Sequence, residues 1–117
     1  MRLHEEMEHY RNVLIVRLKG ELDHHTADGL KQRLEDALLH GRATHVLLNL
    51  AGLAFMDSSG LGVILGRYKT VTARGGRLLI CGAGPAVRRL FELSGLLKIV
   101  TLYDNEHEAL GSLEVVS

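Results

Sequence analysis

The sequence predicts an α/β fold, with a single layer of mixed, largely parallel β-sheet, an antiparallel N-terminal edge strand and about four flanking helices. Short aliphatic runs alternate along the chain with longer segments of helical periodicity, an order typical of βαβ crossovers. The aliphatic runs are nearly continuous, as expected for strands that are covered on both faces. The chain has 117 residues, and we expect positions 1–117 to form a single domain.

The first forty residues are predicted to form a hairpin followed by a helix. Leu3–Tyr10 is expected to be an edge strand, joined by a turn at Arg11-Asn12 to a buried strand over residues 12–19. Residues 26–40 carry apolar side chains at spacings of three and four, which is typical of an amphipathic helix. Its first residue is a threonine that suits the N-cap, and Gly41 suits a left-handed C-terminal stop.

A second strand and a second helix are predicted in the middle of the chain. Residues 44–50 form an aliphatic run that favours a buried strand, and residues 51–56 are expected to be a loop. The helix that follows is predicted over Ser58–Ala73 and ends at the pair Gly75-Gly76. Its inward-facing residues are expected to be Leu61, Ile64, Leu65 and Tyr68.

The last third of the chain is predicted to alternate two strands with two shorter helices. Residues 77–81 favour a third buried strand, and Pro85 is suited to the first position of a helix that ends at Gly95. A last strand is predicted over residues 98–103, before a final helix that opens at the cap residue Asn105. The inward-facing residues of the first of these helices are expected to be Ala86, Leu90 and Leu93.

Composition argues against several classes of function. The chain has 14 Lys and Arg against 14 Asp and Glu, so it has no basic excess for binding the phosphates of a nucleic acid. No apolar run approaches the roughly 20 residues of a membrane span. The single cysteine, Cys81, cannot form an internal disulfide. We therefore expect a cytoplasmic protein that binds neither nucleic acid nor membrane.

The motifs do not favour a metal, nucleotide or hydrolase site. The seven histidines lack metal-site spacing, and one cysteine supplies no second thiolate. The glycines at 60, 62 and 66 match neither the dinucleotide-binding nor the P-loop pattern, although nucleotide binding or hydrolysis stays open as an alternative function. Ser58 and Ser59 lack the G-x-S-x-G context of a hydrolase nucleophile. We expect no metal, no cofactor and no catalytic residue.

A docking surface is predicted around the start of the second helix. Glycines remove side chains from a helix and let the backbone of a partner come close. Phe55 and Met56, just before this helix, would add an apolar anchor to the surface. The glycines expected to contribute to it are Gly60, Gly62 and Gly66.

A serine hydroxyl lies at the centre of this predicted surface. Either Asp57 or Ser58 is expected to cap the helix. A phosphoryl group on Ser58 would carry about −1.5 to −2 charge at a helix N-terminus, where free N–H groups and the helix dipole tolerate it. The same group would disturb a partner that is packed against the glycines. The segment therefore predicts a phosphorylation switch.

Two segments closely resemble a known family. The blocks 20–27 (GELDHHTA) and 55–68 (FMDSSGLGVILGRY) resemble the anti-sigma factor antagonists of spore-forming bacilli, which are STAS domain proteins. Matching motifs at 85–91 and 94–96 extend the resemblance over about residues 3–112. The resemblance implies a sheet flanked by helices, and a protein that regulates sporulation transcription and is not an enzyme.

The resemblance also implies partners. The unphosphorylated protein would bind an anti-sigma factor that is itself a serine kinase, carrying ADP or ATP, and so release the sporulation sigma factor. Phosphorylation of Ser58, the first serine of the D-S-S-G motif, would inactivate it, and a serine phosphatase would restore it. We expect a monomer in isolation, and a structural subunit of a larger STAS complex is a further alternative. The partner surface is expected to contain Asp23, His24, Met56, Asp57, Ser59, Gly60, Gly62 and Gly66.

Overall fold

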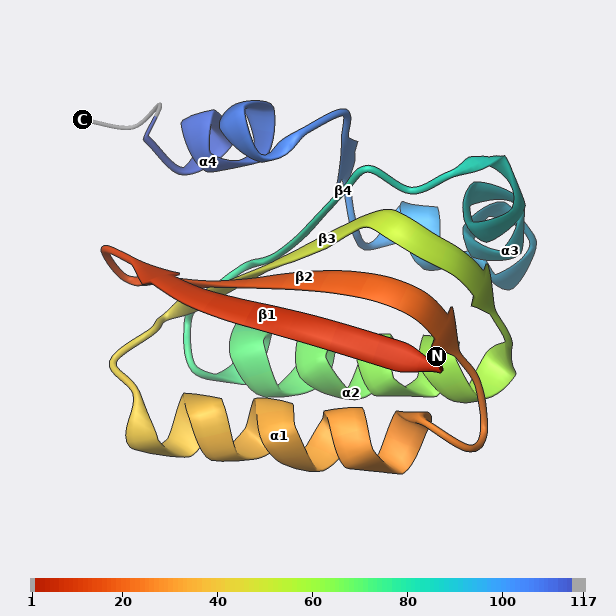
Figure 1. Ribbon diagram of the computed structural model, residues 1–117. Coiled ribbons are helices and arrows are strands. Elements are labelled where there is room, and N and C mark those ends of the chain that lie inside the picture. The colour runs from red at the N-terminus through yellow and green to blue at the C-terminus, as the bar shows by residue number, and fades with distance from the viewer. Residues whose placement is uncertain (1, 115–117) are drawn as a thin grey trace.

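The chain folds around one mixed sheet of five strands. The computed structural model describes residues 2–114, and its strands lie in the order β1-β2-β3-β4-β5 (Figure 1). β1 (Leu3–Tyr10) pairs antiparallel with β2 (Val13–Leu22). β3 (His45–Met56), β4 (Leu78–Cys81) and β5 (Leu102–Tyr103) follow, each parallel to the strand before it. The predicted largely parallel sheet with an antiparallel N-terminal edge strand is confirmed.

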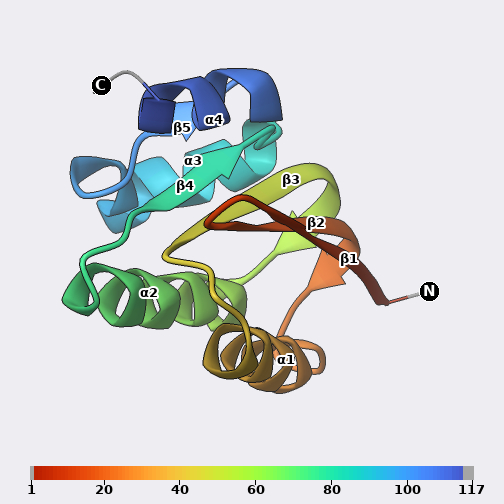
Figure 2. The ribbon, with the colours of Figure 1, turned by 90° about the vertical axis from the view of Figure 1, so that its left-hand side faces the viewer.

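Helices cover both faces of this sheet. α1 (Ala27–His40) and α2 (Ser58–Ala73) lie together on one face, and α4 (Glu106–Glu114) lies on the other (Figure 2). α3 (Pro85–Ser94) packs beside the C-terminal part of β3, and a short 3-10 helix, η1 (Leu96–Lys98), follows it (Figure 1). The α-helices of the described residues agree with the predicted number of about four.

The central strands are aliphatic on both sides, which is why both faces of the sheet can be covered. Leu14, Val16 and Leu18 of β2 belong to the core cluster that includes α1 and α2. Val13 and Ile15 belong to the opposite cluster, which includes Ala109 of α4. Because successive side chains of a strand point to opposite faces, a run without polar residues is what a doubly covered strand needs.

Local sequence patterns place several element ends correctly. The turn between β1 and β2 holds Arg11 in the left-handed region, with φ 55°. Pro85 begins α3, and Gly95 ends it with φ 82°, as predicted. The side chain of Asn105 accepts the N–H of Glu108 at 2.9 Å and so caps α4. Each of these positions depends on residues that are close in sequence.

The two predicted caps of α1 are corrected. The hydroxyl of Thr26 caps no helical N–H and instead donates to the carbonyl oxygen of Glu21 at 3.0 Å. Gly41 is not left-handed, because its φ is −100° and its ψ −178°. A Cβ at position 41 would lie 2.7 Å from the carbonyl oxygen of Ala37. Close packing, rather than a positive φ, therefore favours glycine at this position.

Residues 51–56, predicted to be a loop, instead continue β3 to Met56. They pair with the second half of β2, which itself runs past residue 19 as far as Leu22. Two register shifts interrupt this pairing. The extra strand length comes from pairing with a distant segment. The local sequence carries little sign of it, because the aliphatic run ends at Leu50.

The last predicted strand and the buried face of α3 are also corrected. Only Leu102–Tyr103 pairs with β4, because η1 extends to Lys98 and residues 99–101 form no strand. In α3 the buried residues are Val87 and Phe91, whereas Leu93 is 70% exposed and Ala86 is exposed. Leu90 is partly buried. The helix is therefore rotated relative to the predicted face.

α2 has the predicted bounds, but it buries more of its circumference than predicted. Ile64 is buried as expected, and Leu61, Leu65 and Tyr68 pack against the core while staying partly exposed. The helix contacts α1 as well as the sheet, so it has two covered sides. The further buried residues are Gly60, Val63, Arg67 and Val71.

A network of ion pairs links α4 to the sheet. Arg17 of β2 donates to Glu106 from Nε at 2.7 Å and from Nη2 at 3.0 Å. Asn49 of β3 donates to the same carboxylate at 2.7 Å. The hydrogen bonds from Arg17 hold the pKa of the Glu106 carboxyl below its usual value, although partial burial acts in the opposite direction. The hydrogen bond to Glu106 likewise raises the pKa of Arg17.

Glu106→Gln is expected to lower the free energy of unfolding by about 1–2 kcal/mol at neutral pH, since a hydrogen bond to a charged group contributes roughly 1.5–3 kcal/mol. The folded pKa of Glu106 is depressed, so its stabilisation is present above the unfolded pKa of about 4.3 and is lost as the pH falls through the folded pKa. Urea denaturation should therefore show a smaller difference between variant and wild type in acid. The exposed Glu108→Gln on the same helix is the control, and an equal loss there would contradict the assignment.

Candidate functional site

The candidate site lies where β3 ends and α2 begins. The pairing of β2 with β3 ends with Leu22 opposite Met56, and the N–H of Asp57 then donates to the carbonyl oxygen of Leu22 at 3.2 Å. This bond holds the loop after β2 next to the start of α2, at the carboxyl edge of the parallel strands. Open α/β sheets bind their ligands at this edge. The two blocks that carry the family resemblance, residues 20–27 and 55–68, are therefore neighbours in space.

Asp57, rather than Ser58, caps α2. Its Oδ1 accepts the N–H of Ser59 at 2.8 Å and the N–H of Gly60 at 3.3 Å. Ser58 is the first residue of α2 and is exposed, and its hydroxyl forms no hydrogen bond with any residue that the structure describes. Because this hydroxyl holds nothing in place, it can be modified without removing a contact from the fold.

The three glycines of α2 do not share one face, which corrects the predicted docking surface. Gly60 is buried, and a Cβ there would lie 2.7 Å from Cγ of Leu22 and 2.8 Å from Cγ of Met56. A Cβ on Gly62 or Gly66 would meet nothing within 4 Å. Gly60 therefore lets α2 pack closely on the sheet, while Gly62 and Gly66 leave two positions that line the groove without side chains.

The predicted apolar anchor is also divided between surface and core. Phe55 is 47% exposed and is available to a partner. Met56 is only 8% exposed and belongs to the main hydrophobic core. Since neighbouring residues of a strand point to opposite faces, exposure of one favours burial of the other. Met56 can therefore affect a partner only through the position of α2.

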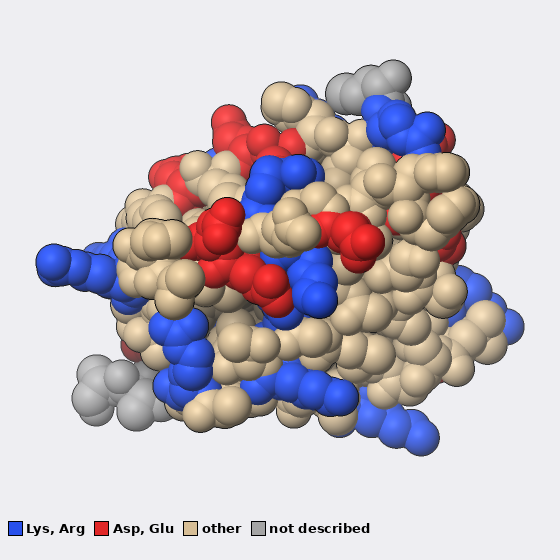
Figure 3. Space-filling model, turned by 90° about the horizontal axis from the view of Figure 1, so that it is seen from below, with Lys and Arg blue, Asp and Glu red and all other residues tan. Residues whose placement is uncertain are grey.

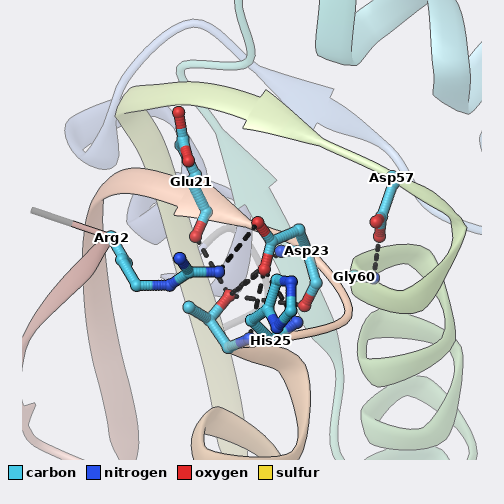
Figure 4. Close-up of polar contacts among 7 residues, drawn as sticks. Arg2, Glu21, Asp23, His25, Asp57 and Gly60 are labelled. Carbon is cyan, nitrogen blue, oxygen red and sulfur yellow. Dashed lines mark hydrogen bonds and ion pairs between the residues drawn. The ribbon is translucent and has the colours of Figure 1, made fainter.

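The loop between β2 and α1 is held by its own carboxylate. Oδ1 of Asp23 accepts the N–H of His25 at 2.9 Å and that of Thr26 at 3.2 Å, and Oδ2 lies 3.6 Å from Arg2 (Figure 4). Partial desolvation raises the pKa of the Asp23 carboxyl, but the His25 bond, the charge of Arg2 and the Thr26 bond outweigh it and keep that pKa below its usual value. Figure 4 shows this loop beside the start of α2, where Asp57 holds Gly60.

A groove of about 490 Å³ lies between α1 and α2, and Ser59, the residue after Ser58, lines it. The sequence places α1 and α2 after neighbouring parallel strands, so both helices begin at the same edge of the sheet (Figure 1). Figure 3 shows this side of the molecule, where acidic and basic side chains lie together near the middle and further basic side chains lie along the lower edge. The groove is lined by His24, Ala27, Asp28, Lys31, Ser59, Gly62, Val63, Gly66 and Arg67.

The sequence did not predict five of the residues that line this groove, Ala27, Asp28, Lys31, Val63 and Arg67, and among these Arg67 is the buried charged residue. It is 4% exposed and lies in the seam between α1 and α2, where its Nη2 donates to Glu35 at 3.1 Å. It follows Gly60 and Val63 at helical spacing, so it occupies an inward position that the sequence pattern assigns to an apolar residue. A search for inward positions irrespective of residue type would have found it.

The described residues contain no group of three or more His, Cys, Asp or Glu side chains placed to hold a metal ion. The thiol of Cys81 is buried, and desolvation raises its pKa to about 11, so it is a poor nucleophile. None of the helices in residues 2–114 is long and apolar enough to cross a membrane.

Comparison with known proteins identifies the family. The STAS domain model matches residues 4–109, which is most of the chain. The chain belongs to the STAS domain family. This STAS protein is 55% identical to the anti-sigma F factor antagonist of Paenibacillus polymyxa, over 100% of both chains. It is 41% identical to the anti-sigma F factor antagonist of Lysinibacillus sphaericus, over 74% of each chain.

Solved structures agree with this assignment. The anti-sigma factor antagonist SpoIIAA in its unphosphorylated form superposes on the STAS chain with a TM-score of 0.84 at 33% identity, covering 97% of this chain and 99% of that one. The phosphorylated form of the Bacillus SpoIIAA superposes with a TM-score of 0.75 at 33% identity, covering 94% and 99%. The predicted family and the predicted fold are thus confirmed.

Proposed function

We propose that this STAS protein is an anti-sigma factor antagonist controlled by phosphorylation of Ser58. The unphosphorylated chain binds an anti-sigma factor that is also a serine kinase, carrying ADP or ATP, and so releases a sporulation sigma factor in the cytoplasm. The kinase phosphorylates Ser58, and a serine phosphatase reverses the modification. In this scheme the chain acts by binding and catalyses no reaction itself.

The observation that carries this proposal is the exposed hydroxyl of Ser58 at the start of α2, which forms no hydrogen bond with the described residues. Asp57 already caps α2, so the serine is not needed to stabilise the helix. The names of the two relatives from Paenibacillus and Lysinibacillus support the antagonist role, and a solved phosphorylated form of SpoIIAA supports the control by phosphate.

The proposed partner surface surrounds Ser58. Its exposed or partly exposed members come from the loop after β2 and from the outer side of α2, where glycine leaves room for a partner backbone. Met56 and Gly60 support the surface from below and do not contact the partner. The contacting residues are Asp23, His24, Phe55, Asp57, Ser59, Gly62 and Gly66.

Ser58→Ala is expected to abolish phosphorylation by the anti-sigma factor kinase, because it removes the acceptor oxygen. Intact-protein mass spectrometry after incubation with this kinase and ATP should show one added phosphoryl group on the wild type and none on the variant. Ser59→Ala is the matched control, since it changes the adjacent, partly buried serine, and it should still take up one group. Phosphate on the Ser58→Ala chain would place the acceptor elsewhere and overturn the assignment of Ser58.

A further inference from the structure

We propose that His24 is the phosphate-binding residue of the phosphorylated site, and that it holds the phosphoryl group of Ser58 as a pH-dependent ion pair. The inference rests on the proposed function only in taking Ser58 as the modified residue. It concerns the phosphorylated chain by itself and requires no partner.

The fold brings the two residues together from separate elements. Because the N–H of Asp57 bonds to the carbonyl oxygen of Leu22, the residues that follow these two positions lie side by side. His24 comes two residues after Leu22, and Ser58 one residue after Asp57. His24 also lines the same groove as Ser59, and both His24 and Ser58 are exposed. A phosphoryl group on Ser58 would therefore be attached one residue from a groove that the imidazole of His24 lines.

Two of the backbone amides that usually bind a phosphate at a helix start are already engaged. The N–H groups of Ser59 and Gly60 donate to the carboxylate of Asp57, so a phosphoryl group cannot use them without displacing the cap. The sequence predicted that free N–H groups at the start of the helix would bind the phosphate, but the N–H groups of Ser59 and Gly60 are not free. The carboxylate of Asp57 also repels a dianion next to it. A phosphoryl group turned away from Asp57 needs a cation from another element.

The charged groups around the loop leave His24 as the nearest available cation. Arg2 lies against Asp23, and Arg67 is buried and paired with Glu35. Lys31 also lines the groove, but it lies in the second turn of α1. At 1.5 Å per residue it is roughly 6 Å farther along the helix than Ala27, the first residue of α1. The remaining neighbours of His24 in this region are the carboxylate of Asp28 in the same groove and the ring of His25, with ring centroids 3.8 Å apart.

The chemistry of the two groups makes their pairing depend on pH. A phosphoserine loses its second proton near pH 6 and an isolated imidazole loses its proton near pH 6.5, so the charges of both groups change over the same pH range. Two such groups in contact titrate as a pair, because a protonated imidazole favours the phosphate dianion. Neutralising part of the phosphate charge would also offset its repulsion from Asp57 and Asp28.

The test measures the phosphate directly. Phosphoserine is installed at position 58 during synthesis by an expanded genetic code, and its second ionisation is followed by ³¹P NMR. The titration midpoint is expected to rise by about half a pH unit in His24→Gln relative to the wild type, since an opposite charge within contact distance favours the ionised form. The matched variant His25→Gln should leave the midpoint unchanged.

Three results would overturn the proposal. These are equal midpoints in the wild type and His24→Gln, an equal shift in His25→Gln, and a shift in Lys31→Gln alone. Circular dichroism checks that each variant is folded, and ¹⁵N spectra of the histidine rings in the wild type should change at His24, and not at His25, when position 58 is phosphorylated. No kinase enters the experiment, so a failure of the kinase to modify Ser58 would reject the proposed function through a separate measurement.

Discussion

Ser58→Asp is expected to weaken binding to the anti-sigma factor kinase by more than about a hundredfold, or roughly 3 kcal/mol, while the fold stays intact. The fold tolerates the change because the side chain is exposed and because a carboxylate is favourable in the first turn of a helix. The complex does not, because docking would bury an unpaired charge beside Asp57, and a buried charge without a partner is costly. Isothermal titration calorimetry against the kinase measures the loss, and circular dichroism checks the fold.

Ser58→Asn is the matched control for this effect. It has nearly the size and shape of the aspartate variant but adds no charge, so it should lose far less affinity than Ser58→Asp. Undiminished binding of Ser58→Asp would reject an electrostatic switch at this residue. Equal losses in the two variants would show that side-chain volume, rather than charge, controls the interface.

Features that depend on neighbouring residues could be predicted from the sequence. Pro85 fixes its own φ and lacks an N–H, so it suits the start of α3 wherever that helix packs. Gly95 ends the same helix in a left-handed conformation that other residues rarely adopt. The bounds of α2 could be predicted for the same reason, because Asp57 precedes it and glycines follow it. The D-S-S-G motif at Ser58 is equally local, and its phosphorylation stays a prediction.

Features that depend on distant partners could not be predicted. β3 extends over residues 51–56 because the end of β2 pairs with it, and nothing in that segment's own pattern requires a strand. Glycine is favoured at position 41 because a Cβ there would lie 2.7 Å from the carbonyl oxygen of Ala37 and 2.9 Å from Nε2 of His9. His9 lies on β1, far away in sequence. In both cases tertiary contacts outweigh local preference. The loop that contains Asp23 is likewise held next to the start of α2 by a contact between distant residues, the bond from Asp57 to Leu22. Only the family resemblance placed Asp23 and Ser58 on one surface.

The glycines of α2 combine both kinds of information. Their number on one helix indicated close backbone approach, but not which side of the helix each occupies. The apolar stripe that would have settled this is interrupted by Arg67, whose charge hides an inward position. Counting from Gly60 through Ile64 and Arg67 to Val71 recovers a single buried face at spacings of three and four. Gly62 and Gly66 then lie outside that face, as the structure shows.

Two alanine substitutions two residues apart on α2 are therefore expected to change stability in opposite directions. Gly60→Ala forces a Cβ to within 2.7 Å of Leu22 and 2.8 Å of Met56, both in the core. Overpacking of this kind costs about 1–3 kcal/mol, and the better helix propensity of alanine recovers at most about 1 kcal/mol. Gly60→Ala should thus lower the free energy of unfolding by about 1–2 kcal/mol.

Gly62→Ala meets no atom within 4 Å, so it should keep the gain in helix propensity and raise the free energy of unfolding by up to about 1 kcal/mol. Urea denaturation of both variants measures the difference, and a loss of the same size in both would contradict the assignment of one glycine to the core and the other to the surface. For the affinity of the kinase we expect the opposite order, with the larger loss in Gly62→Ala. The new methyl group of Gly62→Ala lies in the groove that Ser59 also lines, and it should weaken binding in a chain that is more stable than the wild type. A glycine that lowers the stability of the free protein is then explained by the partner that packs against it.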